Sequence, residues 1–287
     1  MVLAPVQKIQ ECFALPVRIE KEPIRNGRSY EYSSNGNRLY SAYRFLLTRS
    51  YLVSRNGTKY YNLLWMGTGM KRHEAIRLDR SMFEKTIKSP LETKIIKSIK
   101  NNRKMGGGKY SLVQKGKYIG LPFYKVSLEE RKTCPDTCTI RDKCYGNNMP
   151  FAHRIDHTHP KFFSKLKLEI DELLLINPLG FVVRLHELGD FFSLGYTAFW
   201  MHRVQENEKL KLIGFTAHKK ETQIGRLIQL INCYDNVDIR FSGEDTVISD
   251  TKVEGSFTCP AQLDTKISCA SCTLCWDSKV QVRFKEH

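Results

Sequence analysis

From Tyr124 onward the chain alternates apolar β-type runs with amphipathic helical stretches, and this alternation restricts the fold more than any other feature of the sequence. One expected helix occupies each gap between successive strands, which is the order of βαβ units with parallel strands. We therefore expect an α/β fold that is either a partial (βα) barrel or an open parallel sheet. The expected strands are 124–128, 181–187, 212–217 and 237–243, and the expected helices are 160–176, 194–205 and 220–231.

Charge is distributed unevenly along the 287 residues, which carry a formal net charge of +16. Up to Thr133 there are 27 Lys and Arg against 10 Asp and Glu, whereas the remainder has 19 against 20. An excess of this size indicates a polyanionic partner, and nucleic acid, whether DNA or RNA, fits better than an anionic membrane surface. The alternative is a basic face that contacts only solvent.

Three regions follow from these changes in composition. We expect a basic α+β N-terminal region rich in Tyr, Arg and Lys over 1–110, an α/β core over 111–255 and a Cys-rich C-terminal tail over 256–287. No apolar run approaches the roughly 20 residues of a membrane-spanning helix, and the start lacks the apolar stretch of a signal peptide. We therefore expect a cytoplasmic protein with no membrane partner.

Cations and aromatic rings alternate in the first region, a pattern suited to stacking on bases while phosphates are held. Ser89, Pro90 and Glu92 predict a helix start, and the helix that follows, ended by the glycines at 106–108, has a basic surface. With the short helix expected before it, it resembles a helix-turn-helix element; the alternative is an ordinary basic surface helix. The candidate nucleic-acid contacts are Arg38, Arg44, Arg49, Lys94, Lys97, Lys100, Arg103 and Lys104.

Seven of the nine cysteines fall into two short groups, which in a reducing compartment indicates metal ligands rather than disulfides. The first group is Cys134-x3-Cys138-x5-Cys144, in the loop after the first expected parallel strand. Three ligands leave one coordination position open, as a catalytic metal centre requires. Zinc completed by a nearby histidine is the alternative.

The second group lies in the tail, where Cys259-Pro260 precedes Cys269-x2-Cys272-x2-Cys275. Three closely spaced cysteines with a remote Cys-Pro resemble the ligand pattern of bacterial ferredoxins, which favours a [4Fe–4S] cluster. Zinc is the alternative at this site. Four ligands close the coordination sphere, so the expected role is structural, electron-transferring or substrate-anchoring.

Polar and ionisable residues follow three of the expected strands directly. In parallel α/β folds the carboxyl ends of the strands form the functional edge, so these side chains are expected to meet there. Each residue taken alone is equally explained as a loop residue or a helix cap. The candidate catalytic residues are His186, Glu187, Asp190 and Lys219, and the candidate cofactor-binding residues are Thr216, Ser242 and Glu244.

Five segments together resemble the phage and plasmid gene-product-88 family over about residues 124–287. They are CPDTCTIRDKCYG, RLHELGDFFS, IGFTAHKK, FSGED and ISCASCTLCWDSKVQVRFKEH, in that order. The cysteine loop on a βα scaffold is also similar to that of radical S-adenosylmethionine (SAM) enzymes. That resemblance implies a [4Fe–4S] cluster on the first cysteine group, with SAM at the fourth iron. The second cysteine gap is five residues instead of two, and Glu187-Leu188-Gly189-Asp190 is only a loose counterpart of the Gly-Gly-Glu segment.

Three functions are consistent with these patterns. The leading one is an iron–sulfur, radical-SAM-like enzyme that acts on nucleic acid or on a nucleic-acid-associated substrate. The second is a non-catalytic regulator or accessory protein that binds nucleic acid and contains structural or redox-sensing metal. The third is an iron–sulfur nuclease with a divalent-metal site among the strand-end acids.

Overall fold

A computed structural model of the chain describes residues 86–139, 141, 144–149 and 151–285. The chain divides into two compact units, residues 1–72 and 73–287, and all described residues belong to the second. The candidates Arg38, Arg44 and Arg49 lie outside the described residues, as does most of the expected N-terminal region. Within the described part, no helix has the length and apolar character needed to cross a membrane.

A five-stranded sheet with the order β2-β3-β5-β6-β7 forms the centre of the described unit. The strands β3, β5, β6 and β7 are parallel and adjacent in chain order, and β2 pairs antiparallel with β3 at one edge. The expected α/β class with a parallel sheet is therefore confirmed. The strands are β2 (Ile96–Ser98), β3 (Phe123–Ser127), β5 (Phe181–Leu188), β6 (Leu210–Thr216) and β7 (Val237–Phe241).

Three helices connect the parallel strands, and all three agree with the sequence-based expectation. They are α7 (Phe162–Ile176), α8 (Leu194–Glu206) and α9 (Gln223–Ile231). Because parallel crossovers are right-handed and the strands follow chain order, the helices lie on the same face of the sheet. Large side chains such as Phe162 and Trp200 are fully buried there, and each contributes about 1.5–3 kcal/mol by leaving water.

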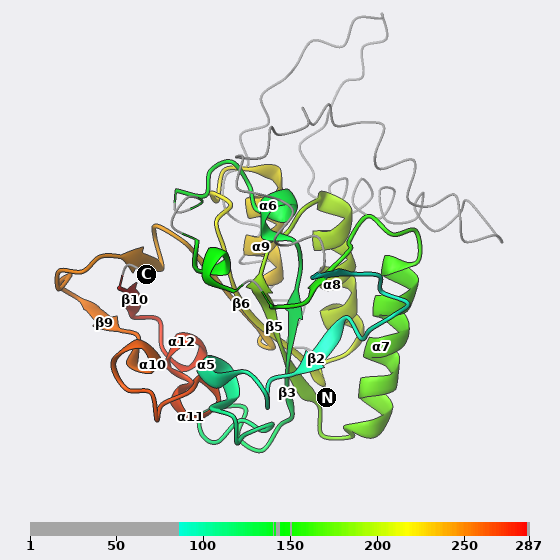
Figure 1. The fold of residues 1–287 in the computed structure, drawn as a ribbon, viewed down its shortest axis with the longest axis horizontal. Helices are drawn as coiled ribbons and strands as arrows, with labels where there is room; N and C mark the ends of the chain where they lie inside the picture. The colour runs from blue at the N-terminus through cyan, green and yellow to red at the C-terminus, as the bar shows by residue number, and fades with distance from the viewer. Residues whose placement is uncertain (1–85, 140, 142–143, 150, 286–287) are drawn as a thin grey trace, which may run out of the picture. The chain divides into compact units, whose positions relative to one another are not determined.

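The other face of the sheet is covered by short segments from two distant parts of the chain (Figure 1). Met105 of α5 (Arg103–Gly106) and Trp276 of α12 (Leu274–Asp277) pack in one apolar cluster with Phe123 of β3. The Trp276 ring meets the Phe123 ring edge-on at 5.7 Å. The Cys-rich tail is thus part of the core packing.

A second, three-stranded parallel sheet joins the tail to the end of the 111–255 region, and β10 (Gln281–Phe284) lies between the two other strands. Its neighbours are β8 (Thr246–Ile248) and β9 (Ser256–Thr258). Two further short helices, α10 (Pro260–Leu263) and α11 (Cys269–Cys272), follow β9. A two-stranded parallel sheet joins β1 (Ile87–Lys88) to β4 (Arg154–Ile155).

The helix expected from Ser89 to the glycines at 106–108 is wrong. Only α5 is helical there, and residues 96–98 form the edge strand β2. The buried Glu169 carboxylate of α7 accepts hydrogen bonds from the backbone N–H groups of Ile95 and Ile96 at 2.8–3.1 Å. A carboxylate more than 70 residues away in the chain therefore accepts hydrogen bonds from backbone N–H groups that would otherwise bond within a helix. The described part contains no helix-turn-helix element over these residues.

Candidate functional site

The first cysteine group lies in the loop that leaves the carboxyl end of β3. Helix α6 (Glu130–Thr133) begins the loop and the short 3-10 helix η1 (Tyr145–Asn148) ends it. Cys134, Cys138 and Cys144 form no disulfide and line one small cavity of about 30 Å³. That is the space taken by about one water molecule, so the three sulfur atoms lie around a common small volume.

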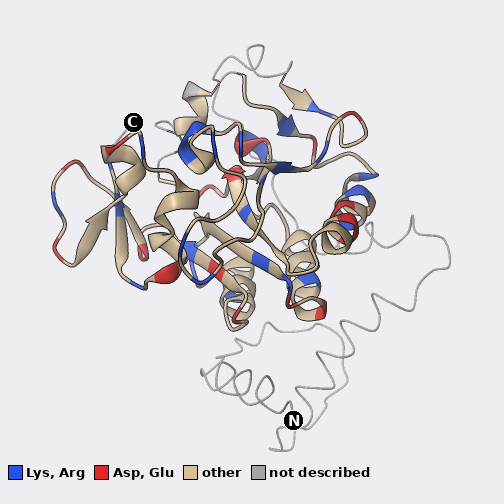
Figure 2. Cartoon of the chain, turned by 90° about the horizontal axis from the view of Figure 1, so that it is seen from below, with Lys and Arg blue, Asp and Glu red and all other residues tan. Residues whose placement is uncertain are grey.

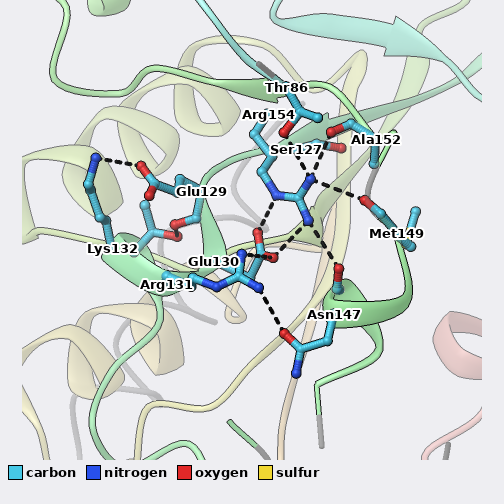
Figure 3. A network of polar contacts seen from close by, with 12 residues as sticks. Thr86, Ser127, Glu129, Glu130, Arg131, Lys132, Asn147, Met149, Ala152 and Arg154 are labelled. Carbon is cyan, nitrogen blue, oxygen red and sulfur yellow. Dashed lines mark hydrogen bonds and ion pairs between the residues drawn. The ribbon is translucent and has the colours of Figure 1, made fainter. Parts of the chain in front are cut away.

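A buried ion pair holds the two ends of this loop together (Figure 3). Arg154 Nε donates to Glu130 Oε2 at 2.7 Å, and Arg154 Nη2 donates to Glu130 Oε1 at 2.8 Å. The guanidinium also donates to the carbonyls of Ala152 and Gly146 at 2.8 and 3.1 Å. Glu130 precedes the cysteines and Gly146 follows them, so Arg154 fixes both sides of the loop.

A second arginine supports the same turn. Arg131 donates to Glu130 Oε1 at 3.2 Å and to Asn147 Oδ1 at 3.0 Å. Gly146 approaches this pair closely, because a Cβ atom there would lie 2.8 Å from Glu130 Oε1 and 3.0 Å from a Leu188 methyl. A side chain at position 146 would therefore displace the carboxylate.

The cysteine loop packs against the loops that follow β5 and β6. Thr133 Oγ1 accepts from the Asp190 backbone N–H at 3.2 Å, and Thr137 Oγ1 donates to the Ala217 carbonyl at 2.9 Å. The cysteine loop and two of the three strand-end segments thus meet at the carboxyl edge of the sheet, as the sequence predicts.

Asp190 is the carboxylate of this edge. Its Oδ1 accepts from Phe191 N at 2.7 Å and Thr216 Oγ1 at 2.9 Å, and its Oδ2 accepts from Ala217 N at 2.7 Å. Burial raises the pKa of Asp190, while the nearby His218 and these hydrogen bonds oppose the increase. Burial also raises the pKa of Cys134, and Asp190 adds to that effect.

Two histidines lie beside Asp190 in the interior. His186 is buried, its Nε2 lies 2.9 Å from the Tyr196 hydroxyl, and its Nδ1 has no hydrogen-bond partner among the described residues. Burial lowers the pKa of His186 to about 3, with a smaller effect from His218. His218 Nε2 donates to the Phe191 carbonyl at 2.7 Å. Both imidazoles therefore support the edge from inside the protein.

Glu187 faces a different place from Asp190. Its Oε2 accepts from Lys125 Nζ and Ser127 Oγ, each at 2.5 Å, and its Oε1 accepts from the Asn102 side chain. It lines a separate cavity of about 820 Å³.

The remaining candidates of the edge are exposed. Lys219 and Ser242 are exposed, and Glu244, also exposed, pairs with Lys220 at 2.5 Å. The structure therefore gathers Asp190 and Thr216 at the cysteine loop, with His186 beneath them. It gives Glu187 and Glu244 separate partners, so the three acids of the expected nuclease site do not share one set of contacts.

The second cysteine group surrounds a pair of cations. Cys259 follows β9, Cys269 and Cys272 lie in α11, and Cys275 lies in α12; all four thiols are free. Arg184 of β5 donates from Nη1 to Cys269 Sγ at 3.5 Å. Burial raises the pKa of Cys275 to about 12, with added repulsion from Cys269 and Cys259, while Arg184 opposes the increase.

Lys104 connects the two cysteine groups. Its ammonium lies 5.7 Å from the centre of the Tyr145 ring, directly after Cys144 in the chain. Burial lowers the pKa of Lys104, and the nearby Arg184 lowers it further, whereas Cys259, Cys269 and Cys275 oppose that change. Cations thus lie between the first and second cysteine groups.

The thiols are not arranged as a finished coordination sphere. Across the described residues, no three side chains of His, Cys, Asp or Glu form a group that would hold one metal ion. A metal at either group would therefore require the thiol side chains to turn toward a common point. The donor chemistry fits, because each group places several cysteine thiols near one another in a shielded position.

The basic candidates of the described part do not form one surface. Lys94, Lys100 and Arg103 are exposed and Lys97 is half-buried, but Lys104 points toward the tail cysteines. Figure 2 shows Lys and Arg scattered over strands, helices and loops of the described part. Nothing in this arrangement defines a nucleic-acid surface.

No protein-family model, no curated protein and no solved structure matches the chain.

Sequence reasoning missed Glu130, Arg154 and Arg184. Glu130 lies four residues before Cys134, so it could have been recognised as an acidic residue at the start of the cysteine loop. Arg184 interrupts the apolar run of 181–185, and a charge inside a core strand is a usable signal for a buried partner. Arg154 has no local signal, because its partner lies 24 residues away in the chain.

Proposed function

We propose that the chain is an iron–sulfur enzyme of the radical-SAM type that acts on nucleic acid or on a nucleic-acid-associated substrate. Cys134, Cys138 and Cys144 would hold a [4Fe–4S] cluster with one open iron. The tail cysteines would hold a closed second cluster, with zinc as the alternative there. The observation that carries the proposal is the meeting of three cysteine residues with Asp190 at the carboxyl edge of the parallel sheet.

The topology supports this proposal. Four parallel strands in chain order, with helices on one face, are the arrangement of a segment of a (βα) barrel. The cysteine loop follows the first of these strands, as the similarity to radical-SAM enzymes requires. In both barrels and open parallel sheets, ligands bind at this edge.

The charges around the tail cysteines support a metal there. Arg184 Nε is shielded from solvent and has no hydrogen-bond partner within the described part of the chain, and the groups that raise the pKa of Arg184 include Cys269 and Cys275. A shielded guanidinium is stabilised by negative charge, and metal-bound thiolates would provide it. The Lys104 ammonium would be stabilised by the same thiolates.

The chain's own residues have distinct tasks in this proposal. When bound and reduced, the open cluster would supply an electron for the cleavage of SAM. Asp190 and Thr216 would shape the wall of the site, and the Arg154–Glu130 pair would hold the cysteine loop in place. The basic first half would attract the polyanionic substrate.

A non-catalytic metal protein that binds nucleic acid is the second candidate. One observation favours it: both carboxylate oxygens of Asp190 are already occupied by protein donors, so the residue resembles a structural support. In that case metal removal would unfold the chain, and nucleic-acid binding would weaken steeply with salt.

Anaerobic metal analysis separates these candidates. Iron, sulfide and zinc per chain are measured for wild type, for Cys134, Cys138 and Cys144 all changed to Ala, and for Cys269, Cys272 and Cys275 all changed to Ala. Thr139→Ala, an exposed change in the first loop, is the control. We expect each triple variant to lose one cluster's share, and SAM cleavage to disappear in the first triple variant. Zinc alone after attempted cluster reconstitution, or undiminished cleavage in that variant, would contradict the enzyme proposal.

A further inference from the structure

The cavity beside Glu187 is distinct from the small cavity among the cysteines. It has a volume of about 820 Å³, within the range of about 300–1,000 Å³ for small-molecule sites. Its lining comes from β2 and β3, from the loop after β2, from residues 152–153 and from α7. It therefore opens beside the antiparallel edge of the sheet.

Two lysines of this cavity lie directly opposite each other. Lys97 of β2 and Lys125 of β3 are register partners in the antiparallel pair. Like charges in this position repel and destabilise the strand pair. Burial lowers the pKa of Lys97, and Lys125 lowers it further. The Glu187 carboxylate, which binds Lys125, and the Glu169 carboxylate oppose this decrease only in part.

The acids of the cavity are largely engaged already. Glu187 binds Lys125, Ser127 and Asn102, and Glu169 accepts the backbone N–H groups of β2. Glu172 is exposed at the rim. Among the ion pairs formed between described residues, none includes Lys94 or Lys97. These two ammonium groups are thus the positive charges that the cavity offers to a ligand.

The remaining residues that line the cavity are suited to contact a planar ring of a ligand. Ile96, Leu173 and Ile176 provide apolar surface, and Tyr124 provides an aromatic ring. Asn101 adds an amide that both donates and accepts hydrogen bonds. Lysines together with apolar surface and an amide match a ligand with a phosphate and a flat, polar ring.

We propose that this cavity binds a phosphorylated ligand of nucleotide size, with Lys94 and Lys97 holding the phosphate and the α7 wall holding the ring. The ligand is either a free nucleotide or the phosphorylated end of a strand, which share this chemistry. The site requires neither cysteine group, so it stands or fails separately from the proposed enzyme activity.

Calorimetric titration of the full-length protein at low salt tests whether Lys94 and Lys97 hold a phosphate. The probes are inorganic phosphate and the nucleoside monophosphates of A, G, C and U. Lys94→Gln with Lys97→Gln is compared with Lys109→Gln with Lys115→Gln, which removes the same charge from two exposed lysines outside the cavity. We expect at least one monophosphate to bind, and the first double variant alone to bind it tenfold or more weakly. Absence of binding at millimolar concentration, or equal weakening in both double variants, would overturn the proposal.

Two exposed neighbouring residues of α7 test whether the α7 wall of the cavity holds the ring of the ligand. Ile176 is 69% exposed and lines the cavity, whereas Leu175 is 83% exposed and does not. Ile176→Asp places a negative charge against the ligand, so we expect it to weaken nucleotide binding about tenfold while Leu175→Asp leaves it unchanged. Equal effects of the two changes, or phosphate bound as tightly as every nucleotide, would refute a site for a ring.

The source of the phosphate is resolved by competition. A single-stranded oligonucleotide with a 5′-phosphate is added against the bound nucleotide, with the same strand lacking the phosphate as control. Displacement by the phosphorylated strand alone assigns the cavity to strand ends. Failure of both strands to compete assigns it to free nucleotides. Equal displacement by the two strands would show general backbone binding and would overturn the proposal.

Discussion

Arg154 and Glu130 form a bidentate ion pair across the cysteine loop, with bonds of 2.7 and 2.8 Å. The Arg154 side chain is fully buried and the Glu130 side chain is 5% exposed. A buried pair gains little over apolar packing when both partners are present, but removing one partner leaves an isolated charge in the interior. The pair therefore makes the geometry of the cysteine loop depend on a residue that follows the loop.

Arg154→Met should lower the free energy of unfolding by about 3–5 kcal/mol, because it leaves the Glu130 carboxylate buried without its main partner. Lys132→Met is the matched control, since it breaks the Lys132–Glu129 pair in which the lysine is 45% exposed. Such a surface pair contributes about 0–1 kcal/mol. Urea denaturation measures both. A loss below about 1 kcal/mol for Arg154→Met would show that Arg131 alone compensates Glu130.

Stability should fall in acid because of two histidines. Burial lowers the pKa of His186 to about 3 and that of His157 to about 4, whereas an unfolded histidine titrates near 6.5. Below about pH 6.5 the unfolded chain therefore binds protons that the folded protein excludes. The unfolding free energy then decreases toward lower pH, by up to about 1.4 kcal/mol per pH unit for each histidine. The decrease ends as pH passes below each folded-state value.

His186→Gln and His157→Gln test this assignment, because glutamine cannot take up the proton. Each change should reduce the slope of unfolding free energy against pH between about 6.5 and 4, and the double change should reduce it further. Slopes that stay equal to wild type would assign the acid sensitivity to other groups.

Arg184→Met should weaken metal retention by the tail cysteines. The change removes the guanidinium that contacts Cys269. Loss of an outer partner of a metal ligand typically lowers affinity 10–100-fold, so we expect chelator-induced release to become at least tenfold faster. Lys279→Met, which removes a lysine that is 92% exposed, should leave the rate unchanged. Equal rates for wild type and Arg184→Met would mean that Arg184 does not compensate the thiolates.

Two glycines with similar backbone angles allow the energetic cost of backbone strain to be measured separately from the cost of steric crowding. Gly189 has φ +86° and Gly120 has φ +80°, so alanine at either costs about 1–2 kcal/mol in backbone energy. Only at Gly189 would the new Cβ collide, at 2.6 Å from Thr133 Oγ1 and 2.8 Å from Leu128 Cβ. We expect Gly189→Ala to lose a further ~1–3 kcal/mol in thermal or urea denaturation and to loosen the contact with Asp190. Equal losses would show that the cysteine loop moves freely.

The periodicity of apolar residues was sufficient to predict the four parallel strands and the helices between them. Each element buries its own stripe, as Leu166 and Ile170 of α7 do, so the signal is local. The edge strand was not predictable in this way. Ile95, Ile96 and Ile99 have helical spacing, and only the pairing with β3 and the Glu169 carboxylate converts the segment to a strand.

The meeting of the first cysteine loop with Asp190 and Thr216 followed from the rule that parallel strands end at one edge. That rule places backbone ends but not side chains. Glu187 directly follows His186, and because successive strand residues point to opposite faces it binds Lys125 on the far side of the strand from Tyr196, the partner of His186. The edge rule alone groups the two residues, whereas this alternation separates them.

The position of β10 determines the order in which parts of the protein can assemble during synthesis. Because β10 lies between β8 and β9, those two earlier strands have no common neighbour until Gln281–Phe284 has left the ribosome. The backbone N–H of Cys259 then bonds to the Arg283 carbonyl at 2.8 Å, which fixes the first tail cysteine after the other three have been made. All residues of the main parallel sheet and of the first cysteine loop are therefore synthesised before the strand that closes the second group.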